Sequence, residues 1–71
     1  MEVNLEAIEQ LIKNRFRNNK TWFAEEIGIN YSYLHLILNG KRKATSEKFC
    51  NAIIQYCKNN NLDYMEYIIL P

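Results

Sequence analysis

Residues 20–40 read KTWFAEEIGINYSYLHLILNG and contain two short helical patterns on either side of a glycine. Ala24 is followed four residues later by Gly28, six residues after that by Leu34, and four residues after that by Leu38. A small residue such as Ala24 lets a second helix approach closely, and Gly28 suits the left-handed residue that often ends a helix. Leu34 and Leu38 lie one helical turn apart and should hold the second helix on a core. This spacing predicts a helix-turn-helix at about residues 20–39.

The beginning of the second helix carries side chains that suit a wet surface. Tyr31, Ser32, Tyr33 and His35 crowd its first five positions. Hydroxyl and imidazole groups at the exposed end of a short helix favour contact with a partner. Partly buried surface tyrosines and an ordinary exposed histidine are the alternative interpretation of these residues.

Helical patterns continue on both sides of this motif. Apolar residues recur at three- and four-residue spacing from Leu5 to Phe16, which predicts a first helix, and EKFCNAIIQYCKNN predicts a fourth. The segment YMEYII predicts a short last helix or, because it is rich in β-branched residues, a strand. Together these patterns predict one all-α domain over residues 1–71. The expected N-cap residues are Asn4, Asn19, Asn30, Thr45 or Ser46, and Asp63.

Composition and charge limit the class of protein. The chain has 71 residues, of which 48% are hydrophobic and 24% are charged, so we expect a small packed core and no disordered segment. No apolar run approaches the ~20 residues that span a bilayer, and the acidic start does not resemble a signal peptide, so we expect a soluble cytoplasmic protein. The net charge is +1, but residues 13–48 carry eight basic and three acidic side chains and net +5. One face is therefore expected to be basic.

The two cysteines, Cys50 and Cys57, are seven residues apart in the fourth predicted helix. Seven residues at ~1.5 Å rise place their Cα atoms roughly 10 Å apart, which is too far for a disulfide. We expect both to be small buried hydrophobic residues in a reducing compartment.

The stretch KTWFAEEIGINYSYLHLILNGKRKATSEKF, residues 20–49, resembles the phage-repressor and Cro family of helix-turn-helix domains. Its most specific parts are the turn AEEIGIN and the ending LNGKR. The resemblance implies a compact five-helix domain whose last element is a short helix or a strand. It also implies a protein that binds double-stranded operator DNA with its third helix in the major groove, usually as a homodimer.

The resemblance also implies roles for individual residues. Lys20 lies in the first turn of the second helix, where the family grips the DNA backbone, and Arg17 and Asn19 precede it closely. The residues expected to contact bases are Tyr31, Ser32, Tyr33, His35 and Leu36. The residues expected to contact phosphates are Arg17, Asn19, Lys20, Asn39, Lys41, Arg42 and Lys43.

Two departures from the family pattern affect these expectations. Ala44 stands where the basic loop of the family often leads into a proline. The exposed positions of the third helix carry no Arg, Lys, Asn or Gln, the residue types that make bidentate contacts to guanine and adenine. We therefore expect modest affinity, with phosphate contacts supplying much of it.

The apolar C-terminal segment DYMEYIILP is large for an exposed end. Its side chains cannot all fit into so small a core, so part of the segment should cover a partner surface. Homodimerisation through Tyr64–Pro71 is the prediction, because family dimers often pair in this region.

No arrangement of residues predicts catalysis, a cofactor, a metal or a small-molecule substrate. The adjacent Glu25 and Glu26 point to different sides of a helix, and there is no glycine-rich phosphate loop. We expect a transcriptional regulator of phage, plasmid or mobile-element type, acting as a repressor. Two alternatives remain: a helix-turn-helix used for protein–protein interaction, and a sequence-independent DNA-binding accessory protein of a plasmid or phage assembly.

Overall fold

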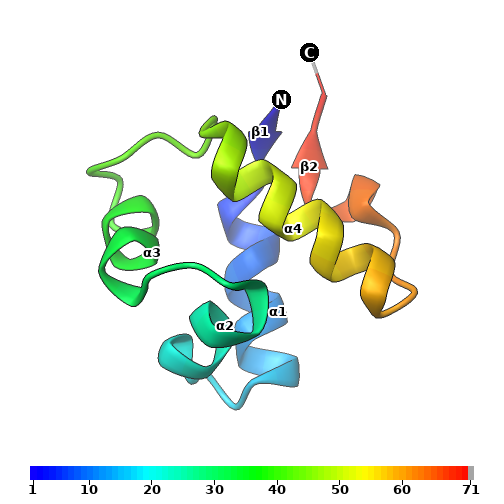
Figure 1. Cartoon of the computed structure of the whole chain (residues 1–71), viewed down its shortest axis with the longest axis horizontal. Coiled ribbons are helices and arrows are strands. Elements are labelled where there is room, and N and C mark those ends of the chain that lie inside the picture. The colour runs from blue at the N-terminus through cyan, green and yellow to red at the C-terminus, as the bar shows by residue number, and fades with distance from the viewer. Residues whose placement is uncertain (71) are drawn as a thin grey trace.

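The computed structural model describes residues 1–70, and within them the chain is mostly helical with one small sheet (Figure 1). The elements, in chain order, are β1 (Glu2–Val3), α1 (Leu5–Arg15), α2 (Lys20–Ile27), α3 (Tyr31–Leu38), α4 (Glu47–Asn59), the 3-10 helix η1 (Tyr64–Glu66) and β2 (Ile68–Ile69). The expected fifth helix is a single 3-10 turn, and a strand follows it. The last residue of the predicted dimer segment, Pro71, lies outside the described residues.

Each α-helix begins at a side-chain cap. The carboxamide oxygens of Asn4, Asn19 and Asn30 accept hydrogen bonds from backbone N–H groups in the first turns of α1, α2 and α3. Ser46 caps α4 in the same way, and Asp63 caps η1. These caps satisfy N–H groups that have no partner inside the helix. The predicted starts are confirmed, and Ser46 is the cap of α4.

Each of the four α-helices in residues 1–70 is followed by a residue with left-handed backbone. Gly28 (φ 73°) follows α2 and Gly40 (φ 76°) follows α3, and the conformation strains neither because glycine has no Cβ. Asn61 (φ 56°) follows α4, and asparagine tolerates this region. Arg17 (φ 53°) follows α1 and is the residue type least suited to it. Gly28 confirms the predicted helix end.

The core lies where α1, α2 and α4 meet, and an aromatic cluster fills it. The ring of Phe16 packs edge-on against Trp22 and Phe23, with centroid distances of 4.9 and 5.2 Å. It also packs against the tilted ring of Tyr56 at 5.9 Å. Trp22 is 43% exposed and lies at the solvent-facing edge of this cluster. The predicted apolar stripes are confirmed, with buried residues Ile8, Leu11, Ile12, Phe23, Ala24, Leu34, Ile37, Phe49, Ile53, Tyr56 and Cys57.

The two-stranded sheet closes the molecule by pairing its two ends (Figure 1). β1 and β2 are antiparallel, with Val3 opposite Ile68, and both of these side chains are buried. The Val3 N–H donates to the Ala44 carbonyl at 2.9 Å, and the Asn4 N–H donates to the Tyr67 carbonyl at 2.8 Å. β1 therefore ties the C-terminal segment to the segment before α4.

Cys50 and Cys57 are both buried on α4 and neither forms a disulfide, as the spacing predicts. Burial raises the pKa of each thiol above its ordinary value. A thiol with a raised pKa stays protonated and is a poor nucleophile. Both cysteines therefore act as small apolar groups in the core. Within residues 1–70, no helix combines the length and the apolar character that crossing a membrane needs.

Candidate nucleic-acid interface

The turn between α2 and α3 sets the direction in which α3 leaves the core. The N–H of Ile29 donates to the Ala24 carbonyl at 2.9 Å across the left-handed Gly28. Ile29 and Ala24 are both buried, and Asn30 then starts α3. The small Ala24 side chain leaves room for the chain after Gly28 to fold back onto α2, which is the role that its spacing predicts. α3 is thereby held on the core by one face and leaves the other face to solvent.

The two faces of α3 differ sharply. Leu34 and Ile37 are fully buried, and Leu38 is half-buried. The opposite face lies at helical spacing and is exposed, apart from Leu36, which is half-buried. We call this face the α3 stripe, and it consists of Tyr31, Ser32, His35, Leu36 and Asn39.

The α3 stripe is internally ordered along one row. The rings of Tyr31 and His35 stack, with centroids 5.9 Å apart and an interplanar angle of 29°. One turn further, the Asn39 Nδ2 and His35 Nε2 atoms are 2.9 Å apart. In this contact the carboxamide N–H donates and the imidazole nitrogen accepts. The three residues of this row, Tyr31, His35 and Asn39, are exposed, and their hydroxyl, imidazole and carboxamide groups can bond to base edges.

Tyr33 lies outside the α3 stripe, unlike the other four residues predicted to contact bases. It is half-buried, and its hydroxyl donates to the Oγ of Ser46, the cap of α4. The Arg42 guanidinium carbon and the Lys48 Nζ each lie 5.6 Å from the centroid of its ring. Tyr33 therefore joins α3, the basic loop and α4 inside the chain.

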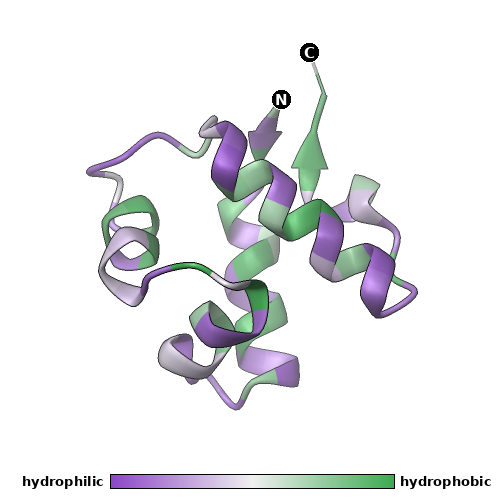
Figure 2. Cartoon of the chain, in the orientation of Figure 1, coloured by the Kyte–Doolittle hydropathy of each residue, from purple (hydrophilic) through white to green (hydrophobic). Residues whose placement is uncertain are grey.

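The basic loop follows α3 directly, and its three cationic side chains, Lys41, Arg42 and Lys43, are exposed. The Lys41 and Arg42 N–H groups both donate to the Leu36 carbonyl, at 2.9 and 3.2 Å, after the left-handed Gly40. The start of the loop is therefore fixed to the end of α3. In Figure 2 the loop is the long hydrophilic connection between α3 and α4.

The turn between α1 and α2 holds the other predicted phosphate contacts. Arg17 is exposed with left-handed backbone, and Asn19 accepts from the Trp22 N–H at 3.0 Å. Lys20 is half-buried in the first turn of α2. In Figure 1 the start of α2, α3 and the basic loop succeed one another along the left side of the view. Along the chain, cationic residues therefore lie on both sides of α3, in the α1–α2 turn and first turn of α2 before it and in the basic loop after it.

Lys48 belongs beside these groups, although no role was predicted for it from the sequence. It lies in the first turn of α4, two residues after the Ser46 cap, and its side chain is exposed. In the sequence, the one indication of a role for Lys48 was its position in the basic region 13–48. Its place beside Tyr33 follows from the fold, which brings the start of α4 next to that ring.

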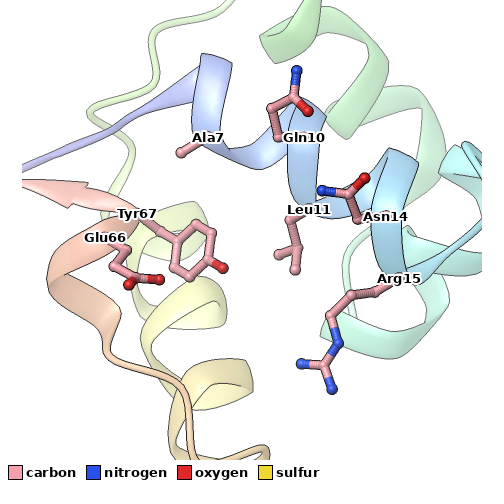
Figure 3. A pocket seen from close by; sticks show the side chains of 7 residues that line it. All are labelled: Ala7, Gln10, Leu11, Asn14, Arg15, Glu66 and Tyr67. Atoms are coloured by element: carbon pink, nitrogen blue, oxygen red, sulfur yellow. The ribbon is translucent and has the colours of Figure 1, made fainter.

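A pocket lies outside the α3 stripe and the basic loop. A groove of about 380 Å³ lies between α1 and the segment before β2, with Leu11 at its floor and Arg15 and Glu66 on opposite sides (Figure 3). It is on α1, away from the α3 stripe. Within residues 1–70, no three His, Cys, Asp or Glu residues gather as a metal site would need.

Comparison with family models, with curated proteins and with solved structures gives no match.

Proposed function

We propose that this chain is a sequence-specific double-stranded DNA-binding transcriptional regulator with a Cro/repressor-like helix-turn-helix fold. α3 enters the major groove of its operator, and occupancy of the site blocks polymerase. The observation that carries the proposal is the largely exposed polar face of α3, the α3 stripe, on a helix that cationic residues precede and follow in the chain.

The dimensions and chemistry of α3 support this role. An α-helix with its side chains is about 10–12 Å in diameter, and the major groove is about 12 Å wide, so a helix such as α3 fits the groove. Ser32 and Tyr31 offer hydroxyls, His35 offers ring nitrogens, and half-buried Leu36 offers a methyl surface for thymine. These groups discriminate bases less strongly than bidentate arginine or asparagine contacts, so the specificity ratio should be modest.

Phosphate contacts supply most of the affinity in this proposal. Lys41, Arg42 and Lys43 act from one side of α3, with Asn39 at its end, and Arg17, Asn19 and Lys20 act from the α1–α2 turn. Because each neutralised phosphate releases counterions, binding should weaken steeply as salt increases.

Homodimerisation through residues 64–71 is part of the proposal. Tyr64, Met65, Ile69 and Leu70 are 39%, 51%, 50% and 48% exposed, which is a large apolar surface for the end of a small domain. A twofold dimer would present two α3 helices to half-sites about one helical turn of DNA apart. Sedimentation at high micromolar concentration, with and without DNA, should give the mass of two chains. A monomeric mass in both conditions would remove the dimer and leave DNA binding intact.

The experiment that tests the function compares two single charge reversals by fluorescence anisotropy on a labelled duplex. Lys41→Glu and the control Lys58→Glu each change the net charge from +1 to −1. Lys58 is exposed in the last turn of α4, at the end of α4 away from the basic loop (Figure 1). We expect Lys41→Glu to weaken binding and to reduce the slope of log K against log salt by about 1 or more, and Lys58→Glu to do neither. Equal losses would contradict a located interface.

A second candidate, a helix-turn-helix used for protein binding, is favoured by the exposed aromatic rings. Tyr31 is 42% exposed and Trp22 is 43% exposed, and aromatic residues are enriched in protein interfaces. This candidate predicts no salt-dependent binding to any duplex. A sequence-independent DNA-binding accessory protein, by contrast, would show the salt dependence and bind all duplexes alike.

A further inference from the structure

Tyr33 links side chains of three segments: α3, the basic loop and the start of α4. Its ring lies on α3, its hydroxyl donates to Ser46 at the cap of α4, and the cationic ends of Arg42 and Lys48 lie at its ring. Ser46 Oγ also accepts from the Phe49 N–H, so the phenol is joined to the first turn of α4. A side chain held in this way is unavailable to a base edge.

The two cations at the ring are held without being neutralised. An aromatic ring attracts a cation through its quadrupole at distances up to about 6 Å, and the cation keeps its charge. A free arginine or lysine loses rotamer freedom when it grips a phosphate, and this ordering opposes binding. Arg42 and Lys48 are already restricted by Tyr33, so they lose less on binding. Both side chains remain exposed, so both can reach a phosphate.

We propose that Tyr33 is a positioning residue that aims Arg42 and Lys48 at the DNA backbone, and that Lys48 is a phosphate-contacting residue. This inference rests on the proposed DNA-binding function. It assigns base reading to Tyr31, Ser32, His35 and Leu36 and removes Tyr33 from that group. The pair of cations then fixes the register of α3 in the groove without carrying sequence information.

The test is a mutant cycle in which fluorescence anisotropy measures DNA affinity. One duplex, the selected duplex, carries the sequence that the chain enriches from a random library, and the other is a scrambled duplex of the same length. The variants are Tyr33→Leu, the pair Arg42→Gln and Lys48→Gln, and all three changes together. We expect Tyr33→Leu to weaken binding on the order of tenfold, by the same factor on both duplexes. In the background without Arg42 and Lys48, the same change should have no further effect. A loss that falls only on the selected duplex would mean that Tyr33 reads a base, and a loss that persists in that background would mean that Tyr33 does not act through the two cations; either result would overturn the inference.

Tyr33→Phe is the matched control because it keeps the ring and removes only the hydroxyl. Its affinity should stay within roughly twofold of the original chain. Proton NMR supplies a readout that needs no DNA, since the side-chain methylenes next to the charges of Arg42 and Lys48 should show ring-current shifts. These shifts should persist in Tyr33→Phe and disappear in Tyr33→Leu. Random-coil shifts in the original chain would overturn the inference.

The outcomes separate the two proposals. If the original chain binds no duplex, the proposed function fails, and the ring-current shifts still decide whether Tyr33 holds the two cations. If the chain binds DNA and Tyr33→Leu binds equally well, only the role of Tyr33 fails. If Tyr33→Leu does not fold, Lys48→Gln decides instead: a uniform loss on both duplexes supports the phosphate contact, and unchanged affinity contradicts it.

Discussion

At the scale of single residues, the backbone of Arg17 stands out. Its φ of 53° lies in the left-handed region, which costs an L-residue other than glycine or asparagine about 1 kcal/mol or more. The equivalent positions after α2, α3 and α4 are Gly28, Gly40 and Asn61. An arginine at this position, exposed in the α1–α2 turn, is consistent with a cation required by a partner rather than by the fold.

Arg17→Gly should separate stability from binding. Relief of the strained φ offsets the entropy that glycine loses on folding, so the free energy of unfolding should stay constant or increase by up to about 1 kcal/mol. Affinity for DNA should fall, because one cation is lost. Urea unfolding and anisotropy measure the two effects, and Asn18→Gly at φ 60° is the control that keeps the charge. Destabilisation by more than about 1 kcal/mol would show that the Arg17 side chain supports the fold.

Three buried titratable groups, Cys50, Tyr56 and Cys57, and the half-buried Tyr67 predict a loss of stability at alkaline pH. Burial raises the pKa of Cys50 and Cys57 above 9.0, and of Tyr56 and Tyr67 above 10.0. Above these values the unfolded chain releases protons that the folded chain retains, so stability is complete below about pH 9 and falls as pH rises further. Urea midpoints with a reductant between pH 7 and 11 measure this. With Cys50→Ala and Cys57→Ala combined, the decline should begin about one pH unit higher, and an unchanged profile would contradict the assignment to the thiols.

At the scale of elements, Ser46 has two functions at the start of α4. Its Oγ accepts from the Phe49 N–H as a cap and from the Tyr33 hydroxyl as a tether. Ser46→Ala removes both contacts and should reduce the free energy of unfolding by about 1 to 2 kcal/mol. Thr45→Ala, at the exposed neighbouring residue, should change it by less than about 0.5 kcal/mol. Denaturant unfolding checks both, and equal effects would contradict the cap assignment.

Helix boundaries were predictable because their causes are local. A carboxamide or hydroxyl caps N–H groups two or three residues away, and Gly28 supplies its own left-handed backbone, so Asn4, Asn19, Asn30 and Gly28 were identified from the sequence. The end of α1 was predicted too, since the apolar pattern runs to Phe16 and α1 ends at Arg15, but the left-handed backbone of Arg17 was not, because an arginine carries no local signal for it. Its conformation follows from how α1 and α2 pack.

The contacts that depend on packing were not predictable in the same way. β2 is a strand because Ile68 pairs with Val3, a residue at the other end of the chain, and a local pattern cannot specify that partner. Tyr33 was grouped with the base-contacting residues, yet its hydroxyl reaches Ser46, 13 residues away. That contact depends on the angle between α3 and α4.

At the scale of the whole molecule, a nearly neutral chain places its charge unevenly. The net charge is +1, but residues 13–48 net +5 and include the cations that precede and follow α3 in the chain. The apolar C-terminal surface lies on other elements, η1 and β2. The excess positive charge and the exposed apolar side chains therefore lie on different elements, and the proposed operator binding and homodimerisation would use one each.

The most direct measurement is selection from a random duplex DNA library at about 0.15 M salt, followed by sequencing. The account predicts enrichment of a palindrome whose half-sites lie roughly 10 base pairs apart. A single enriched half-site would keep DNA reading and remove the symmetric dimer, and retained DNA without an enriched sequence would remove base reading by the α3 stripe. No retained DNA from a folded sample would contradict the central claim and would direct attention to a protein partner of Tyr31.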